Sequence, residues 1–550
     1  MTFGILMQRY RGFLSYQKEE VGLTMVNTQQ SAAIERVPSG ISGFDQITQG
    51  GLLKGETYLL MGPPGAGKTI FGNQLCFNHV VNGGCAIYLT LLAETHSRML
   101  SHMQAFSFYR EEPLADRLHL LSGYTVLEQQ GLDALLTLIR KEVRKQHASL
   151  LMIDGAVTIG QNATSIRERK EFLHALSVIT ETVGCTTMLL LQSDGDAYDQ
   201  PEHTMVDGLF QISTYLNDMR AVREFQVRKF RGSNFLMGRH LYEINEDGFN
   251  IHPRTESLFQ ASQQSLPPSL TTLNPAERLS FGIPSLDKMM RGGVPAATST
   301  VVMGAPGTGK TLLGLHFLYQ GALQNEAGLY FGFSETPAQL KRRMTHLGLK
   351  IEDVVTNNLL NIDWQPPTED IIDVLAERLF EQIDKHGIRR LFIDGLAGFQ
   401  GTTVSATRLQ LFLASLFEAL RKLDVTTVWG IELADLFSPT IVMTDLIANI
   451  ANIGDNIIFL RHVELHSQLY RLLSIMKMRQ SGYDPSIREF RITDSGLDVA
   501  PTFDSAEAIL TGMARQPEPA GASSGRPYIS NMARPETFRS EVLHAQEEHE

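Results

Sequence analysis

The sequence predicts two tandem α/β domains, each built on a mostly parallel β-sheet flanked by helices. Three observations indicate this fold class: a long internal repeat, apolar runs of strand length, and longer periodic segments between those runs. The chain has 550 residues, 43% of them hydrophobic, which is enough for full cores. We therefore expect two large domains, in place of the three or four that the length alone suggests at roughly 150 residues each.

The internal repeat sets the domain boundaries. Residues 38–62 align with residues 280–304 without a gap, and GPPGAGKT (62–69) aligns in the same register with GAPGTGKT (304–311). Later pairs keep the order with small slips of the kind that loop insertions produce: LLMIDG with RLFIDG, VRKFRGS with IMKMRQS, and YEINEDGFNIHP with FRITDSGLDVAP. A repeat this long indicates a duplicated domain and not a short-period solenoid.

The expected organisation follows from the repeat and from changes in composition. The polar stretch after the first copy contains Pro267 and Pro268, which is typical of a linker, and proline-rich sequence follows the second copy. The predicted segments are an N-terminal extension (1–30), a first domain (31–256), a linker (257–272), a second domain (273–502) and a largely disordered C-terminal tail (503–550).

Four apolar runs in each copy have the length of strands. They are YLLMG, AIYLTLL, LLMIDG and TTMLLLQ in the first copy, and TVVMG, GLYFGF, RLFIDG and TTVWGIE in the second. Near-continuous apolar strands that alternate with helices are typical of a parallel sheet covered on both faces. EFQVRKF and LYRLLSIMKM, later in each copy, are predicted to form strands of an added hairpin.

Each copy contains the P-loop pattern G-x-x-x-x-G-K-[ST] between a predicted strand and a predicted helix. Glycines at these spacings let the backbone wrap around phosphates, so that amide groups and the helix N-terminus face them. The lysine is placed for the β- and γ-phosphates and the threonine for Mg²⁺. A single match can be a chance glycine loop, but two in matched context predict two ATP sites. Their residues are Gly62, Pro63, Pro64, Gly65, Ala66, Gly67, Lys68, Thr69 and Ile70, and Gly304, Ala305, Pro306, Gly307, Thr308, Gly309, Lys310, Thr311 and Leu312.

A strand-end aspartate accompanies each P-loop. Asp154 and Asp394 follow buried apolar runs and lie at nearly the same sequence distance from Lys68 and Lys310. A carboxylate at such a strand tip can hold the water shell of Mg²⁺. The predicted metal-binding residues are therefore Thr69, Asp154, Thr311 and Asp394.

ATP hydrolysis also needs a group that orients or deprotonates the attacking water. The second strand of each copy runs into LLAET (91–95) and GFSET (332–336), so Glu94 and Glu335 are the candidate bases. The alternative interpretation of each glutamate is a helix cap beside a threonine.

A Lys-x-Arg pair recurs on a later strand of each copy, as Lys229 with Arg231 and as Lys477 with Arg479. Cations two residues apart on a strand point the same way. They form either a solvated strand face or a finger that reaches a neighbouring subunit's γ-phosphate, and their recurrence favours the finger. Fingers in trans require a ring or a filament.

Charge and cysteine content narrow the functional classes. Lys and Arg total 48 against 60 Asp and Glu, a formal charge of −12, which disfavours a nucleic-acid-coating protein. Three cysteines are too few for a disulfide framework or a zinc site. Neither an apolar run of about 18 residues nor a secretory signal is visible, so we expect a cytoplasmic protein without membrane spans.

Taken together, these residues resemble the KaiC family, the circadian-clock ATPases of the RecA-like superfamily. The resemblance covers about residues 31–502 and rests on GISGFDQITQGG, GIPSLDKMMRGG, the paired P-loops, VRKFRGS, MKMRQS and IREFRITDSGLDV. It implies two RecA-like domains and a double-ringed homohexamer with ATP and Mg²⁺ at subunit interfaces. It further implies slow ATP hydrolysis in the first ring, Ser/Thr autokinase or autophosphatase chemistry in the second, and small KaiB-like, KaiA-like or signalling partners.

The chain departs from the family pattern at the glutamates. The family has two adjacent glutamates after the second strand, the first serving as base. Here the first position is Ala93 in one copy and Ser334 in the other, so Glu94 and Glu335 match only the second glutamate.

A second departure concerns the family's adjacent Ser–Thr phosphorylation pair. Counting back from IGDNIIFLRHVE places Ala451 and Asn452 there, and neither accepts phosphate. Ser438 and Thr444 lie upstream as weak substitutes. We expect an ATPase without autophosphorylation at the usual pair, and the tail shows no resemblance that supports a KaiA-like partner.

Two further functions remain open on the sequence. A RecA- or RadA-like DNA-dependent ATPase shares the P-loop, although the acidic balance disfavours it. A non-hydrolysing nucleotide-gated scaffold is motivated by Ala93 and Ser334.

Overall fold

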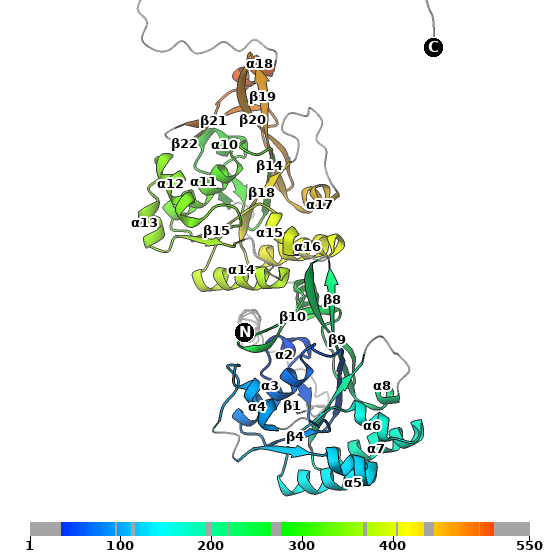
Figure 1. Ribbon diagram of the computed structural model, residues 1–550. Coiled ribbons are helices and arrows are strands. Elements are labelled where there is room, and N and C mark those ends of the chain that lie inside the picture. The colour runs from blue at the N-terminus through cyan, green and yellow to red at the C-terminus, as the bar shows by residue number, and fades with distance from the viewer. Residues whose placement is uncertain are drawn as a thin grey trace, which may run out of the picture.

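The computed structural model describes residues 35–93, 96–111, 116–193, 201–217, 219–265, 277–366, 371–402, 405–433, 445–493 and 496–510. Two copies of one α/β fold follow each other along the chain, blue to green and green to orange in Figure 1. The predicted N-terminal extension (1–30) lies outside the described residues.

The first copy is built on a nine-stranded sheet. In spatial order the strands are β5 (Leu118–Ser122), β4 (Ala86–Thr90), β6 (Leu150–Asp154), β7 (Thr186–Gln192), β3 (Thr57–Gly62), β8 (Gly208–Asn217), β9 (Arg220–Phe230), β10 (Arg239–Asn245) and β11 (Gly248–His252). Six neighbouring strands, from β5 at one edge to β8, pair in parallel, and the three strands from β9 to β11 at the other edge pair in antiparallel fashion.

The second copy repeats this order and the same division into parallel and antiparallel pairs. Its strands are β16 (Leu360–Trp364), β15 (Gly328–Gly332), β17 (Arg390–Asp394), β18 (Thr426–Glu432), β14 (Ser299–Gly304), β19 (Asn456–Leu465), β20 (Gln468–Met478), β21 (Arg488–Thr493) and β22 (Gly496–Val499). A small two-stranded sheet precedes each P-loop, β1 (Arg36–Val37) with β2 (Leu52–Leu53), and β12 (Arg278–Leu279) with β13 (Val294–Pro295).

Helices cover both faces of each sheet (Figure 1). In the first copy they are α2 (Phe44–Ile47), α3 (Lys68–Val81), α4 (His96–Met103), α5 (Tyr124–Lys145), α6 (Val157–Asn162), α7 (Ile166–Thr182) and α8 (Pro201–Met205). In the second they are α10 (Pro284–Met289), α11 (Lys310–Leu323), α12 (Pro337–His346), α13 (Ile351–Thr356), α14 (Ile372–His386), α15 (Ala397–Thr402), α16 (Ala406–Lys422) and α17 (Asp445–Ile453).

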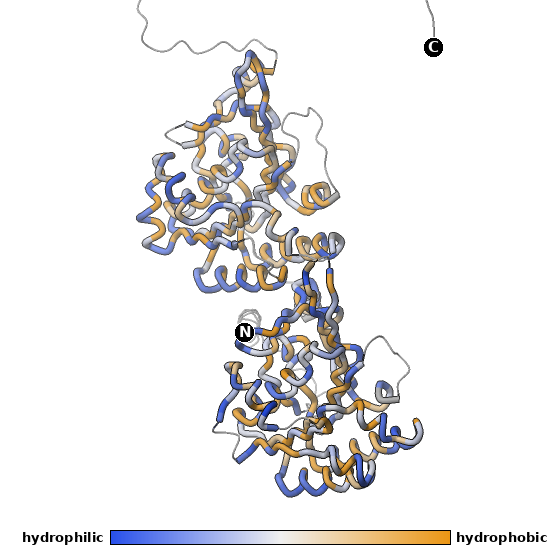
Figure 2. The backbone as a smooth tube through the Cα atoms, in the orientation of Figure 1, coloured by the Kyte–Doolittle hydropathy of each residue, from blue (hydrophilic) through white to orange (hydrophobic). Residues whose placement is uncertain are grey.

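Side-chain alternation along the strands produces two cores per copy. On β3, Leu60 faces the core that contains the P-loop helix α3, whereas Leu59 faces the core shared with α5 and α7. On β14, Val302 and Val301 divide in the same way between α11 and the pair α14 and α16. Figure 2 shows apolar residues concentrated in the interior of each copy. The predicted fold class is confirmed.

Helices lie at two of the predicted boundaries. The expected linker (257–272) begins within helix α9 (Thr255–Ser265), where Phe259 is buried against the second copy. The expected disordered tail (503–550) begins with helix α18 (Asp504–Leu510), where Ile509 packs on the β20 residue Leu472. Both helices are short, so composition alone did not reveal them.

The two copies meet through polar contacts around α9. Buried Asp373 of α14 accepts hydrogen bonds from the amide and hydroxyl of Thr255 and from the guanidinium of Arg408. His252, at the end of β11, contacts Glu243 of its own copy and Glu377 of the other. Burial opposes a charge on His252, but these two carboxylates raise its pKa to about 9.

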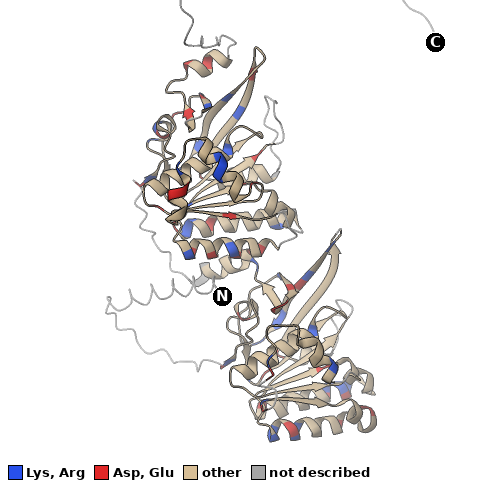
Figure 3. Ribbon diagram, turned by 60° about the vertical axis from the view of Figure 1, so that its left-hand side comes forward, with Lys and Arg blue, Asp and Glu red and all other residues tan. Residues whose placement is uncertain are grey.

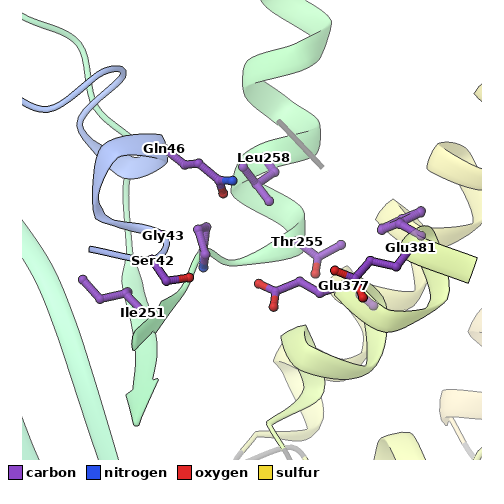
Figure 4. A pocket seen from close by; sticks show the side chains of 11 residues that line it. Ser42, Gly43, Gln46, Ile251, Thr255, Leu258, Glu377 and Glu381 are labelled. Carbon is purple, nitrogen blue, oxygen red and sulfur yellow. The ribbon is translucent and has the colours of Figure 1, made fainter. Parts of the chain in front are cut away.

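A small cavity lies beside this junction (Figure 4). Its volume is about 50 Å³, and its walls come from both copies. None of the predicted ATP-site residues lines it. Within the described segments, no helix is long and apolar enough to cross a membrane.

Candidate functional site

Both P-loops have the geometry that the sequence predicts. β3 ends at Gly62 and α3 begins at Lys68, while Gly67 caps the helix in a left-handed conformation with φ of 96°. A Cβ atom there would lie 2.5 Å from Ile244 Cδ1, the flexible end of a side chain, so the positive φ is what disfavours a larger residue. Gly309 does the same for α11, with φ of 108°. Neither helix has a side-chain cap at this end, which leaves its first amides for phosphate oxygens.

The P-loop lysines fold over their own loops. Lys68 Nζ donates to the carbonyls of Gly62 and Pro63, both at 2.7 Å. Lys310 Nζ donates to Gly304 and to the next carbonyl, both at 2.9 Å. Burial lowers the pKa of Lys310, and nearby Glu432 and Asp394 oppose this effect.

The predicted magnesium residues meet in pairs. Thr69 Oγ1 donates to Asp154 Oδ2 at 3.0 Å, and Thr311 Oγ1 donates to Asp394 Oδ2 at the same distance. Hydroxyl and carboxylate oxygens beside a P-loop are the donor set that Mg²⁺ prefers, so these residues fit the ion. When bound there, Mg²⁺ would supply charge neutralisation at the β- and γ-phosphates.

A tyrosine that the sequence analysis did not select joins each pair. Tyr88 Oη donates to Asp154 Oδ2 at 2.7 Å, and Tyr330 Oη donates to Asp394 Oδ2 at 2.9 Å. Both rings are fully buried. The available signal was the repeat itself, because AIYLT and GLYFG place tyrosine at the same point of equivalent strands.

The candidate base of the second copy lies beside this cluster. Glu335 makes an ion pair of 2.6 Å with Arg343 of α12. Burial raises the pKa of Glu335, Arg343 opposes this, and Asp394 raises the pKa further. The capping box of α12 is formed by Thr336 and Gln339, so Glu335 is not a helix cap. Glu94 lies outside the described residues.

The two sites differ at β7 and β18, the strands that lie between the P-loop strand and the strand that ends in the metal-site aspartate. The register pairs Gly304 with Glu432 and Gly62 with Gln192. Glu432 Oε1 lies 3.8 Å from Lys310 Nζ. The second site therefore carries an additional carboxylate at a position where the first has an amide.

The Lys-x-Arg pairs each cap a helix of their own copy, and Figure 3 marks Lys and Arg along these hairpins. Lys477 Nζ donates to three carbonyls at the end of α17, and Arg479 Nη2 donates to the Asn452 carbonyl at 2.5 Å. Lys229 likewise donates to three carbonyls at the end of α8, and Arg231 to one. Burial and the adjacent arginine lower the pKa of each lysine.

The arginines of these pairs are the exposed members. The side chain of Arg231 is 58% exposed, and Arg479 is also exposed, whereas both lysines are partly buried. The lysine thus holds the helix end, and the arginine remains the candidate finger in each copy.

The positions that match the family's phosphorylation pair lie at the end of α17. Ala451 is buried and Asn452 is exposed, and their carbonyls accept from Lys477. Ser438 and Thr444 lie outside the described residues.

Two further contacts on the P-loops also escaped sequence reasoning. Tyr242 Oη donates to the Ala66 carbonyl at 2.7 Å, and Arg471 Nε donates to the Gly307 carbonyl at 3.2 Å. Both donors come from the antiparallel strands, far from the loops in sequence. Only the folded register brings them there.

The strand order, the paired P-loops and the strand-end aspartates define a tandem RecA-like P-loop ATPase. The sequence matches the family described as "ATPase: KaiC" over residues 37–256 and 279–503. The chain belongs to this family and is an ATPase.

Among its relatives, "Circadian clock oscillator protein KaiC 1" of Synechocystis is 28% identical over 491 residues, which cover 87% of this chain and 92% of that protein. "Circadian clock oscillator protein KaiC" of Synechococcus elongatus is 27% identical over 497 residues, covering 88% and 93%. The similarity thus extends through both copies.

Proposed function

We propose that the chain forms a homohexamer of two stacked rings that binds ATP with Mg²⁺ at both P-loops, at subunit interfaces, and hydrolyses it slowly. The observation that supports this proposal most directly is the threonine–aspartate pair beside the P-loop of each copy. In both pairs, the threonine Oγ1 lies 3.0 Å from the aspartate Oδ2. Chance or a decayed site would not preserve the same contact twice. Ring assembly is supported by family membership and by the exposed arginines Arg231 and Arg479.

Slow turnover follows from the residues around the γ-phosphate position. Ser334 cannot act as the base that a glutamate there provides, and Glu335 is held by Arg343. Burial nevertheless raises the pKa of Glu335 and Arg343 only opposes this, so the slow rate follows from the missing first glutamate and not from a weakened base. We place Glu335 as the water-orienting residue of the second site and Glu94 as its counterpart in the first.

Autophosphorylation at the usual pair is not part of this proposal, because Ala451 and Asn452 carry no hydroxyl. Small KaiB-like or signalling proteins are the partners that the family suggests, and a cytoplasmic location fits the composition. A stoichiometric upshift on a phosphate-affinity gel after incubation with ATP would contradict the first statement.

Phosphate release by wild type, Lys68→Ala and Lys310→Ala, with light scattering for mass, tests the proposal. We expect each variant to lose the contribution of one site and the particle to reach six chains only with ATP. Tight ATP retention without phosphate release in the wild type would favour a nucleotide-gated scaffold. Stimulation by single-stranded DNA would favour a RecA-like DNA-dependent ATPase.

A further inference from the structure

We propose that Tyr88 and Tyr330 are positioning residues, which orient the strand-end aspartates for Mg²⁺ at the two ATP sites. The inference deepens the proposed function and rests on it. Each tyrosine acts through an aspartate and a threonine that the P-loop pattern already identifies.

The same three-residue arrangement occurs in both copies. In each, a phenol hydroxyl and a threonine hydroxyl donate to one oxygen of the aspartate, Oδ2. Two donors on one oxygen restrict the rotation of the carboxylate. In the second copy the threonine hydroxyl also lies 3.2 Å from the other oxygen, Asp394 Oδ1.

The strand register explains how the phenol reaches the carboxylate. Tyr88 lies on β4, two residues before Thr90, which pairs with Asp154 on the neighbouring strand β6. Tyr330 lies two residues before Gly332, which pairs with Asp394. Side chains two apart share a face, so each ring lies along its strand toward the aspartate.

In the second copy, Tyr330 packs closely over Gly332, two residues further along β15. A Cβ atom on Gly332 would lie 2.5 Å from both Cε1 and Oη of Tyr330. Real Cβ atoms do not approach so closely, and the clash would fall on the hydroxyl itself. Gly332 thus fits the ring position seen in the second copy, whereas in the first copy Tyr88 donates to Asp154 with Thr90 at the equivalent position.

Each phenol hydroxyl is the donor in its contact, because an ionised carboxylate oxygen can only accept a hydrogen bond. Removing the hydroxyl while keeping the ring isolates this donation from packing. Loss of a partner that orients a metal-binding group typically weakens metal affinity about 10-fold to 100-fold.

The test compares nucleotide affinity with and without the metal. Full-length Tyr88→Phe, on a Lys310→Ala background that leaves the first P-loop intact, is titrated with a fluorescent ATP analogue in Mg²⁺ and in EDTA. We expect the tightening caused by Mg²⁺ to fall about 10-fold, with the EDTA affinity unchanged. Tyr330→Phe on a Lys68→Ala background repeats the measurement at the second site.

Tyr58→Phe is the matched control. Tyr58 is equally buried in the same sheet, but its hydroxyl bonds to the backbone of Leu53. An unchanged Mg²⁺ effect in both tyrosine variants, or the same loss in Tyr58→Phe, overturns the inference and leaves the proposed function standing. If the wild-type chain binds no analogue in either condition, the proposed function falls and the inference with it.

Discussion

At the scale of single residues, Glu335 is subject to opposing electrostatic influences. Burial and Asp394 favour its neutral form, whereas Arg343 favours its ionised form. Sequence reasoning identified Glu335 from its place after the second strand, but the pairing with Arg343, eight residues later, depends on the start of α12. The ionisation of the candidate base therefore depends on burial and on a neighbour that the motif does not include.

Replacing Arg343 with alanine tests this control of Glu335. Without the guanidinium, the pKa of Glu335 rises further, so the base becomes protonated at a higher pH. On a Lys68→Ala background, the acid limb of the pH–rate profile of phosphate release should move to higher pH. Arg342→Ala, on the same exposed helix, is the control for loss of charge. If the two variants give the same pH–rate profile, the ionisation of Glu335 does not produce the acid limb.

At the scale of elements, the central strands were predictable because their apolar runs are nearly continuous and recur in both copies. The edge strands β5 and β16 were not, because their residues are only partly buried and their sequences are mixed. Helix α9 could not be predicted either, because it is stabilised by contacts with α14 and α16. The contacting residues of those helices lie more than 100 positions away in the sequence. The same limit applies to the site, where motifs revealed the threonine and aspartate but not the tyrosine.

The contact between α9, α14 and α16 depends on Arg408. Its guanidinium pairs with Asp373, which is fully buried, and with Glu256 of α9. Arg408→Leu leaves two carboxylates without this partner and should reduce stability by about 3–5 kcal/mol. Both tryptophans, Trp364 and Trp429, lie in the second copy, so fluorescence during urea unfolding reports its transition.

The exposed pair of Arg389 with Glu277 supplies the comparison for that measurement. Its side chains are 46% and 43% exposed, so Arg389→Leu should cost at most about 1 kcal/mol. Equal shifts of the urea midpoint in the two leucine variants would contradict the role of Arg408 at the junction.

At the scale of the whole molecule, one chain offers two P-loops, and the described contacts bring neither Arg231 nor Arg479 to them. The arginine that does reach a loop is Arg471, which donates to the Gly307 carbonyl. Arg231 and Arg479 instead donate to carbonyls at the ends of α8 and α17. In the ring that we propose, the finger of one subunit would serve the ATP site of the next. Lys229 and Lys477 would keep the helix ends in place while the arginines act across the interface.

Mixing variants distinguishes a finger in trans from one in cis. On a Lys68→Ala background, Arg479→Ala should lower phosphate release at least about tenfold while ATP binding persists, since fingers contribute mainly to the transition state. Lys310→Ala removes the second P-loop but keeps the finger. Subunits of both kinds, mixed without nucleotide and then assembled with ATP, should exceed the average turnover of the separate variants. In the mixture, an Arg479→Ala subunit keeps its second P-loop and can receive an intact Arg479 only from a neighbouring Lys310→Ala subunit. If the turnover of the mixture never exceeds the average, the finger acts within its own chain.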